Sequence, residues 1–250
     1  MIETSNLAVF YLIVGIAAFI VGVSKGGEAG LLGALAVPLI ALMIPAKQAL
    51  GLALPLLMVA DVFAVGLHWR RWNADIVVLL LPGAIIGVTI GTLFITNAPV
   101  EAIQRGLGII ALLFAAYKVF EKRILGVVSY IAHDWHGLAA GAVGGITSAL
   151  AHNGGPPISI YLLMQDIEPR VFISTSAIFF LLLNWIKIPY YYFANLFDLQ
   201  KILSIIWLMP LVPLGVWAGR WIGYRLNKTT FDRIVLALIA LIGLLLVIGF

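Results

Sequence analysis

The chain has 250 residues, of which 63% are hydrophobic and only 10% are charged. Soluble domains carry about 25% charged residues, so this composition indicates an integral membrane protein and excludes an ordinary soluble enzyme or binding domain. The net charge of +4 is explained by basic loops at one membrane surface, so we expect no nucleic-acid partner. Cysteine is absent, which excludes disulfides and thiolate chemistry.

Continuous apolar runs predict an all-α membrane protein rather than a β-barrel, whose strands would alternate polar and apolar residues. A full span needs about 20 apolar residues. We expect ten helical segments, at residues 7–24, 31–44, 47–67, 75–96, 101–118, 132–151, 156–165, 170–192, 199–222 and 230–249. The second and the seventh are too short for a full span, and each follows a glycine-rich break. Both are therefore expected to be half-helices or steeply tilted pieces.

The first break, residues 22–30, reads GVSKGGEAG. Lipid offers no hydrogen-bond partners, so irregular backbone at membrane depth survives only beside protein or a wet cavity. Lys25 would supply positive charge to an anion, and the half-helix that begins near Leu31 would add its N-terminal end. Three glycines would let an oxyanion approach their amides: Gly26, Gly27 and Gly30. In the alternative reading, Lys25 and Glu28 form a structural ion pair at a helix kink.

The second break, residues 147–157, reads TSALAHNGGPP. Proline suits the first turn of a helix, so Pro156 and Pro157 are expected to open the short segment beside His152. His152 is either a satisfied core residue or, beside a symmetric anion site, a ligand that binds an oxyanion when protonated. The other candidate ligands at this break are Ser148, Asn153, Gly154 and Gly155.

Polar residues also interrupt the third and eighth segments, where Asp61, Asn184 and Lys187 stand among apolar neighbours. Asp61 and Asn184 are 123 positions apart, as are Lys25 and Ser148, which indicates two duplicated halves. Asp61 buried alone would be costly, so we expect it to pair with Lys187, Lys25 or His152, or to carry a proton. Four residues are therefore candidates for coupling or gating: Glu28, Asp61, Asn184 and Lys187.

The duplication predicts an N-terminal repeat at 1–118, a cytoplasmic linker at 119–131 and a C-terminal repeat at 132–250. Small residues four apart mark corresponding helices, at Gly83, Gly87 and Gly91 and again at Gly215, Gly219 and Gly223. Five segments in each half give the halves opposite orientations. Basic residues near 68–71, 118–123, 170 and 220–228 place these loops in the cytoplasm and both termini outside, although Lys47 and Lys201 lie on the outer side.

No nucleotide-binding loop, nucleophile motif or metal-ligand spacing occurs in the sequence, so we expect no enzyme activity and neither a cofactor nor a metal. The same glycine-rich faces fit helix packing within one chain or between the two chains of a homodimer.

Several motifs in order resemble the sulfite exporter TauE/SafE family over essentially the whole chain. They are Lys25-Gly26-Gly27, Val37-Pro38-Leu39, Asp61, His152-Asn153-Gly154-Gly155-Pro156-Pro157 with Tyr161-Leu162, and Asn184-Trp185 with Lys187 and Pro189. The resemblance implies transport of sulfite, sulfonates or organosulfur acids across a prokaryotic inner membrane by two duplicated halves. The chain departs from the family pattern at Glu28, Ala29 and Leu31-Leu32, so the first break should be a less open anion nest.

These features predict a secondary transporter of small sulfur-containing anions, either an exporter or a proton-coupled carrier. Its substrate would lie between the two breaks, and the halves would expose it alternately to each side of the bilayer. Two alternatives use the same positive residues: a passive anion channel, and a membrane subunit that binds an anion without moving it.

Overall fold

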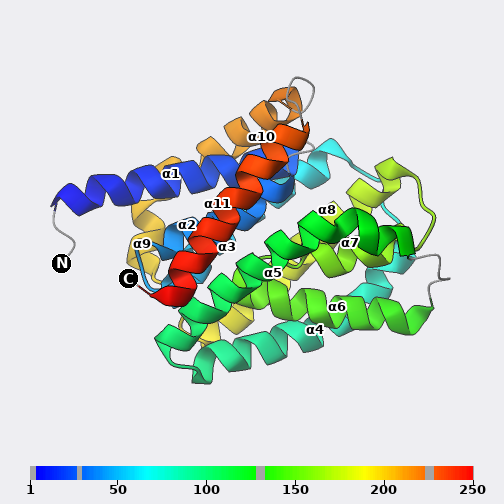
Figure 1. Ribbon diagram of the computed structural model, residues 1–250, viewed down its shortest axis with the longest axis horizontal. Coiled ribbons are helices and arrows are strands. Elements are labelled where there is room, and N and C mark those ends of the chain that lie inside the picture. The colour runs from blue at the N-terminus through cyan, green and yellow to red at the C-terminus, as the bar shows by residue number, and fades with distance from the viewer. Residues whose placement is uncertain (1–3, 27–29, 128–132, 223–227, 250) are drawn as a thin grey trace.

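The computed structural model describes residues 4–26, 30–127, 133–222 and 228–249 (Figure 1). All regular structure within these ranges is helical. The elements are α1 (Thr4–Gly26), η1 (Gly30–Leu35), α2 (Ala36–Ala41), α3 (Ala46–Leu67), α4 (Ala74–Asn97), α5 (Val100–Val127), α6 (Asp134–Ala151), α7 (Gly155–Leu163), α8 (Pro169–Phe193), α9 (Leu199–Ser204), η2 (Ile206–Leu208), α10 (Leu211–Ile222) and α11 (Lys228–Ile248).

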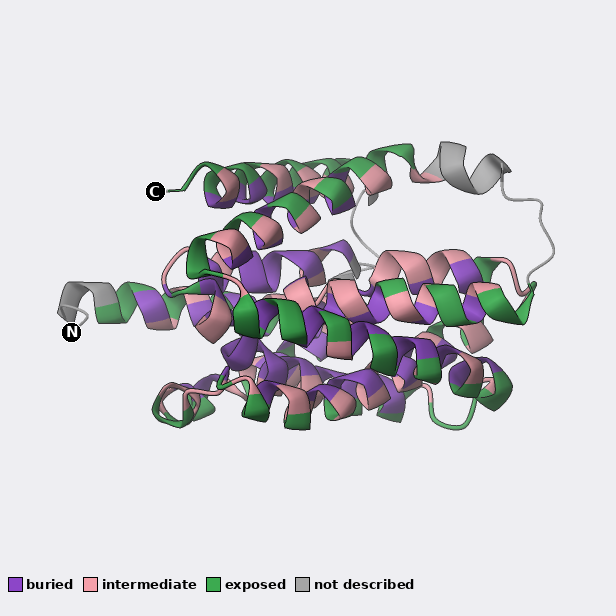
Figure 2. Cartoon of the chain, turned by 90° about the horizontal axis from the view of Figure 1, so that it is seen from below, coloured by how far each residue is buried: buried purple, intermediate pink, exposed green. Residues whose placement is uncertain are grey.

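The all-α membrane architecture predicted from the sequence is confirmed. In the described part of the chain, six helices are long and apolar enough to cross a bilayer: Leu7–Gly26, Ala46–Leu67, Ala74–Asn97, Val100–Glu121, Pro169–Phe193 and Thr229–Ile248. Many large apolar side chains of these helices are exposed, among them Leu93, Leu113 and Trp185. Exposed residues lie along the outer helices of the bundle (Figure 2). Such a surface suits lipid rather than water.

The ninth predicted segment, 199–222, is wrong as a single helix. It is divided into α9, the 3₁₀ turn η2 and α10, with turns at Ile205 and at Met209–Pro210. Pro210 and Pro213 have no backbone N–H, so an uninterrupted ladder of i→i−4 hydrogen bonds cannot form there. The segment 119–131, expected as a linker, begins with helix because α5 continues to Val127.

The two segments expected to be short are short. The second begins as the 3₁₀ turn η1 and becomes α-helical only at Ala36, so the expected α-helical start near Leu31 is wrong. The seventh is the nine-residue helix α7, with both Pro156 and Pro157 in its first turn. The second break therefore leads directly into an α-helix, whereas the first does not.

Helices from the first half of the sequence pack in pairs with helices from the second half. α1 packs along α10, α4 along α6, α5 against α11, and α3 against α8. The first described turn of α1 and the last turn of α11 lie at the same end of the bundle in both views (Figures 1 and 2). The largest apolar core surrounds α2 and α3, and the turn between α6 and α7 lies beside it. The second glycine-rich break and the described start of the first, residues 22–26, thereby reach the interior.

Candidate functional site

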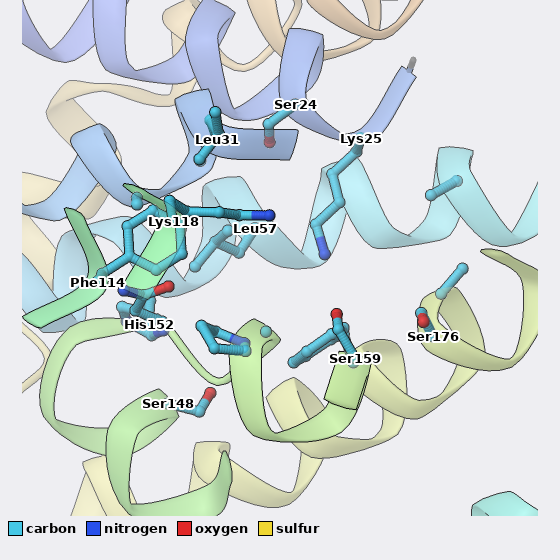
Figure 3. A pocket seen from close by; sticks show the side chains of 18 of the residues that line it. Ser24, Lys25, Leu31, Leu57, Phe114, Lys118, Ser148, His152, Ser159 and Ser176 are labelled. Atoms are coloured by element: carbon cyan, nitrogen blue, oxygen red, sulfur yellow. The ribbon is translucent and has the colours of Figure 1, made fainter. Parts of the chain in front are cut away.

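A cavity of about 500 Å³ lies inside the bundle, between the end of α1, η1, α3, α5, the α6–α7 turn, α8 and α11 (Figure 3). Lys25 lines it from the first half of the chain, and His152 lines it from the second. Pockets that hold small organic ligands have volumes of roughly 300–1,000 Å³, so this cavity has room for a small organic anion.

Lys25 stands in the last turn of α1, between the cavity and a buried carboxylate. Its Nζ lies 2.7 Å from Oδ1 of Asp61 and 4.9 Å from the ring centroid of Phe180. The Lys25 side chain is 22% exposed, whereas that of Asp61 is fully buried. The Lys25 ammonium group thus contacts its counterion Asp61 and also faces the cavity. An anion in the cavity would therefore compete with Asp61 for the ammonium group.

Asp61 lies beneath the cavity and does not line it. Of the three partners expected for its carboxylate, the structure selects Lys25. The Asn184 amide donates a 2.5 Å hydrogen bond to Oδ2 of Asp61, so both carboxylate oxygens are engaged. This contact joins α3 to α8 through the two residues that the 123-position offset relates.

Lys187 is fully buried on α8, behind the second break. Its Nζ lies 2.7 Å from Nδ1 of His152 and donates to Oγ of Ser148 at 3.1 Å. Nε2 of His152 lies 3.0 Å from the carbonyl oxygen of Leu50, which can only accept, so Nε2 carries a hydrogen. With Lys187 as an ammonium group that donates to Nδ1, the pair carries one positive charge. Both ring nitrogens of His152 thus have protein partners, and anion binding by His152 stays a prediction.

His152 has a left-handed backbone, with φ of 52°, where α6 ends. A non-glycine residue in this conformation costs roughly 1–2 kcal/mol. The turn directs the imidazole between Leu50 and Lys187 and lets α7 begin three residues later. Strained backbone of this kind is typical of functional sites.

The glycines of the two breaks have different roles. A Cβ on Gly26 would lie 1.9 Å from the Val216 carbonyl oxygen, and one on Gly154 would lie 2.6 Å from that of Gly144. These two glycines therefore permit close packing, and neither lines the cavity. Gly155 does line it and has open space where a Cβ would stand. Since Pro156 and Pro157 have no N–H, the start of α7 offers fewer backbone donors than predicted.

Of the residues predicted to bind an anion, five line the cavity: Lys25, Ser148, His152, Asn153 and Gly155. Among the gating candidates, Asn184 lines it, while Asp61 and Lys187 are buried behind it. Gly30 begins η1. Gly27 and Glu28 lie outside the described residues, as does any Lys25–Glu28 pair.

The sequence analysis missed several lining residues, including Ser159 of α7 and Ser176 of α8 (Figure 3) and Phe180, also of α8. A signal for two of them was present. Ser176, Phe180 and Asn184 are spaced four apart, which places them on one face of α8. Extending that face from Asn184 toward the helix start would have identified both.

The cavity extends to the end of the bundle that carries the basic loops. There it is lined by His68 after α3, Lys118 and Glu121 of α5, and Asp232 of α11. Lys118 and Glu121 form an ion pair at 2.5 Å and so cancel in charge. Burial lowers the pKa of His68, and Arg71 and Arg220 lower it further, so His68 is uncharged at neutral pH. This mouth is therefore less basic than the loops around it.

The opposite end is packed shut. Lys201 Nζ donates a 2.7 Å hydrogen bond to Oε1 of Gln48 and pairs with Asp198 at 3.0 Å, which ties α9 to the start of α3. A Cβ on Gly51 would lie 1.9 Å from the Leu196 carbonyl oxygen, so the backbones touch there. We call the contacts among Gln48, Lys201, Asp198, Gly51 and Leu196 the outer closure.

A model of the sulfite exporter TauE/SafE family matches residues 14–246, which include both breaks and all cavity-lining side chains described above. The chain belongs to the sulfite exporter TauE/SafE family. No curated protein and no solved structure matches it.

The TauE/SafE assignment confirms the resemblance inferred from the motifs and the identification of a multi-pass membrane protein. TauE/SafE is a family of transporters, which agrees with the lack of enzyme motifs in the sequence. Among the described residues, no group of three or more His, Cys, Asp or Glu could hold a metal ion. Besides the carboxylates of Glu121 and Asp232 at its mouth, the cavity of this TauE/SafE protein presents ammonium, imidazole, hydroxyl and amide groups.

Proposed function

We propose that the protein is a secondary transporter of small sulfur-containing anions, with the cavity as its substrate site. One observation carries the proposal. A lysine from the first half and a Lys187–His152 pair from the second meet around a single cavity inside a membrane bundle. Charge at this depth is costly and normally serves function.

The charges favour a monoanion. The charges of Lys25 and Asp61 cancel, and the Lys187–His152 pair adds one positive charge. The net charge of these four residues is therefore +1. An anionic head group would contact Lys25, with Ser148, Asn153 and the Gly155 amide as further donors. The cavity of about 500 Å³ supports a substrate with an organic part, such as a sulfonate, over bare sulfite.

Asp61 would act as an internal counterion that the substrate replaces. With the site empty, Asp61 neutralises Lys25, so the empty carrier moves only the one positive charge of the Lys187–His152 pair when it reorients. With an anion bound, Lys25 is shared, and Asp61 keeps its hydrogen bond from Asn184. Proton coupling through Asp61 or Glu28 is part of this proposal, and it is motivated by carboxylates at membrane depth.

The helix pairing supports an inverted repeat. α4, fourth in the first half, packs along α6, which opens the second half. The reciprocal pair, α1 and α10, is also in contact, as are α3 with α8 and α5 with α11. A two-fold axis that relates the halves would produce this pattern, with the Asp61–Asn184 contact on the axis.

Alternating access would rock one half against the other about this axis. The cavity reaches the basic end, which the positive-inside rule assigns to the cytoplasm, and the outer closure covers the other end. The structure thus fits an inward-facing state, with both termini on the outer side of a prokaryotic inner membrane. A closed outer end favours a carrier over a permanently open channel.

The direct test is anion-dependent thermal stabilisation of the purified protein. Methanesulfonate, sulfite, sulfate, thiosulfate and acetate are added in turn, and a ligand at 100 times its Kd stabilises the folded state by about 2.7 kcal/mol. The stabilisation should be lost in Lys25→Ala and retained in Lys25→Arg. Lys47→Ala, at a lysine outside the cavity, is the matched control. If no anion stabilises the wild type, the proposal is wrong.

Flux measurements in proteoliposomes separate the remaining candidates. A carrier saturates with substrate and shows exchange of internal for external anion, whereas a channel passes current without exchange. Binding without flux would indicate an anion-binding subunit. If the proton dependence of anion flux is the same in the Glu28→Gln/Asp61→Asn double variant as in the wild type, proton coupling through these carboxylates is wrong.

A further inference from the structure

A second hollow, of about 460 Å³, lies between α5, α6 and α7. We call it the apolar groove. Most of its walls are apolar side chains from Ile110, Leu113, Ala140, Val143, Pro157 and Ile160. Leu113 is 64% exposed and Val143 is 50% exposed, so the groove opens on the membrane-facing surface of the bundle.

Two of the polar side chains at the groove use their hydrogen-bonding groups elsewhere. The Thr147 hydroxyl donates to the Val143 carbonyl of its own helix at 2.9 Å. The Tyr117 hydroxyl donates to Oε1 of Glu121 at 3.3 Å. Hydrocarbon is therefore the chemistry that this groove suits, because it needs no hydrogen-bond partners.

The apolar groove adjoins the anion cavity. Four residues line both: Phe114, Tyr117, Asn153 and Pro156. A single layer of side chains thus separates the apolar groove from the cavity. Beside the cavity, the Lys25–Asp61 and Lys187–His152 pairs together have a net charge of +1. Asn153 and Tyr117 are the polar residues that line both hollows among those described.

We infer that the apolar groove binds the hydrocarbon tail of an amphipathic sulfonate whose head group lies in the cavity. The inference rests on the proposed function for the head group and adds a second subsite for the tail. Charge complementarity fixes the anionic end inside the protein, and the shared residues let the chain pass from the cavity to the membrane face. Movement of the Phe114 ring, which is only 7% exposed, would open the passage.

The test compares Kd values for methanesulfonate, butanesulfonate and 1-hexanesulfonate by calorimetry on purified protein. Each methylene that leaves water strengthens binding by about fourfold. Hexanesulfonate should therefore bind at least about tenfold more tightly than methanesulfonate. Val143→Phe, which fills the groove, should reduce that ratio to about threefold or less and leave methanesulfonate binding unchanged. Ile86→Phe is the matched control, because Ile86 is 58% exposed on α4 and lines neither hollow.

The outcomes separate this inference from the one on which it rests. If methanesulfonate binds and chain length has no effect, the groove holds only lipid acyl chains and the tail subsite is wrong. An unchanged chain-length ratio in Val143→Phe would also overturn it, since the tail would then lie elsewhere. If no sulfonate binds at all, the proposed function itself fails.

Discussion

At the scale of single residues, the candidate site depends on how charges are paired. Lys25 and Asp61 form an ion pair with unequal exposure, 22% for the lysine and none for the carboxylate. Removing one partner of a buried pair costs about 3–5 kcal/mol when the remaining charge is left without solvent. Lys25 escapes that cost because the cavity gives it access to water or to an anion.

We expect Asp61→Asn to bind anions more tightly and to transport them worse. Without its internal counterion, Lys25 should hold a sulfonate about tenfold more tightly, which corresponds to about 1.4 kcal/mol. The empty variant would carry a second unpaired positive charge when it reorients, so exchange should persist while net flux falls. Calorimetry and paired exchange and net-flux assays in proteoliposomes measure this.

The control for that substitution is Asp75→Asn, at an exposed residue in the first turn of α4. It should change neither affinity nor flux. Equal loss of exchange and net flux in Asp61→Asn would show that Asp61 has a different role.

At the scale of helices, close approach of backbones holds the second break in place. A Cβ on Gly83 would lie 2.0 Å from the Leu138 carbonyl oxygen, and one on Gly87 would lie 2.1 Å from that of Ala142. The α1–α10 crossing has the same character, since a Cβ on Gly215 would lie 2.3 Å from the Phe19 carbonyl oxygen. Small residues replace a hydrophobic driving force between helices that lipid does not provide.

Gly87→Ala should destabilise the protein by about 1–3 kcal/mol, because the new methyl group forces α4 away from α6. Gly106→Ala is its counterpart on α5, where a Cβ would meet nothing within 4 Å. Alanine is intrinsically about 1 kcal/mol better than glycine in a helix, so this variant should be neutral or more stable. Thermal unfolding in one detergent compares the two, and equal destabilisation would refute the packing explanation.

At the scale of the whole molecule, the two ends of the cavity differ. One end is open near His68 and Glu121, and the other lies under the outer closure. The Lys201 backbone N–H and, after it, the Lys201 side chain lower the pKa of Asp198 from its ordinary 3.8. A carboxyl with a lowered pKa stabilises the folded state above its unfolded pKa and stops doing so as pH falls through the lowered value. The closure should therefore weaken only in acid below about pH 4.

A cross-link over the outer closure should stop transport. The chain contains no cysteine, so Gln48→Cys and Lys201→Cys can be introduced without removing native thiols. A short bifunctional thiol reagent would join α3 to α9 and hold the outer end shut. We expect flux to fall at least about tenfold after cross-linking, while anion binding from the open side persists.

Either single-cysteine variant treated with the same reagent is the control and should keep its flux. Full transport by the cross-linked protein would mean that this end does not open during the cycle.

The sequence alone was sufficient for the features that depend on local composition. Runs of apolar residues predicted the helical segments, because a span must satisfy its own backbone in lipid. Glycine and proline predicted both short segments, since these residues decide locally where a helix can begin and end. The ionisable residues Lys25, His152 and Asp61, which interrupt apolar runs, predicted a polar site inside the bundle, and the cavity lies beside them. Segment 199–222, which is divided and not a single helix, has prolines at 210 and 213, whose effect is also local and was underestimated.

Only the tertiary structure decided which groups meet. Asp61 had three eligible partners, and the crossing of α1 with α3 selected Lys25. Gly26 and Gly155 have equal freedom as residues, yet the first packs against α10 and the second faces the cavity. Lys187 became the partner of His152 because α8 lies behind the α6–α7 turn. Such outcomes depend on distances between segments far apart in the chain, which helix packing sets and local sequence does not encode.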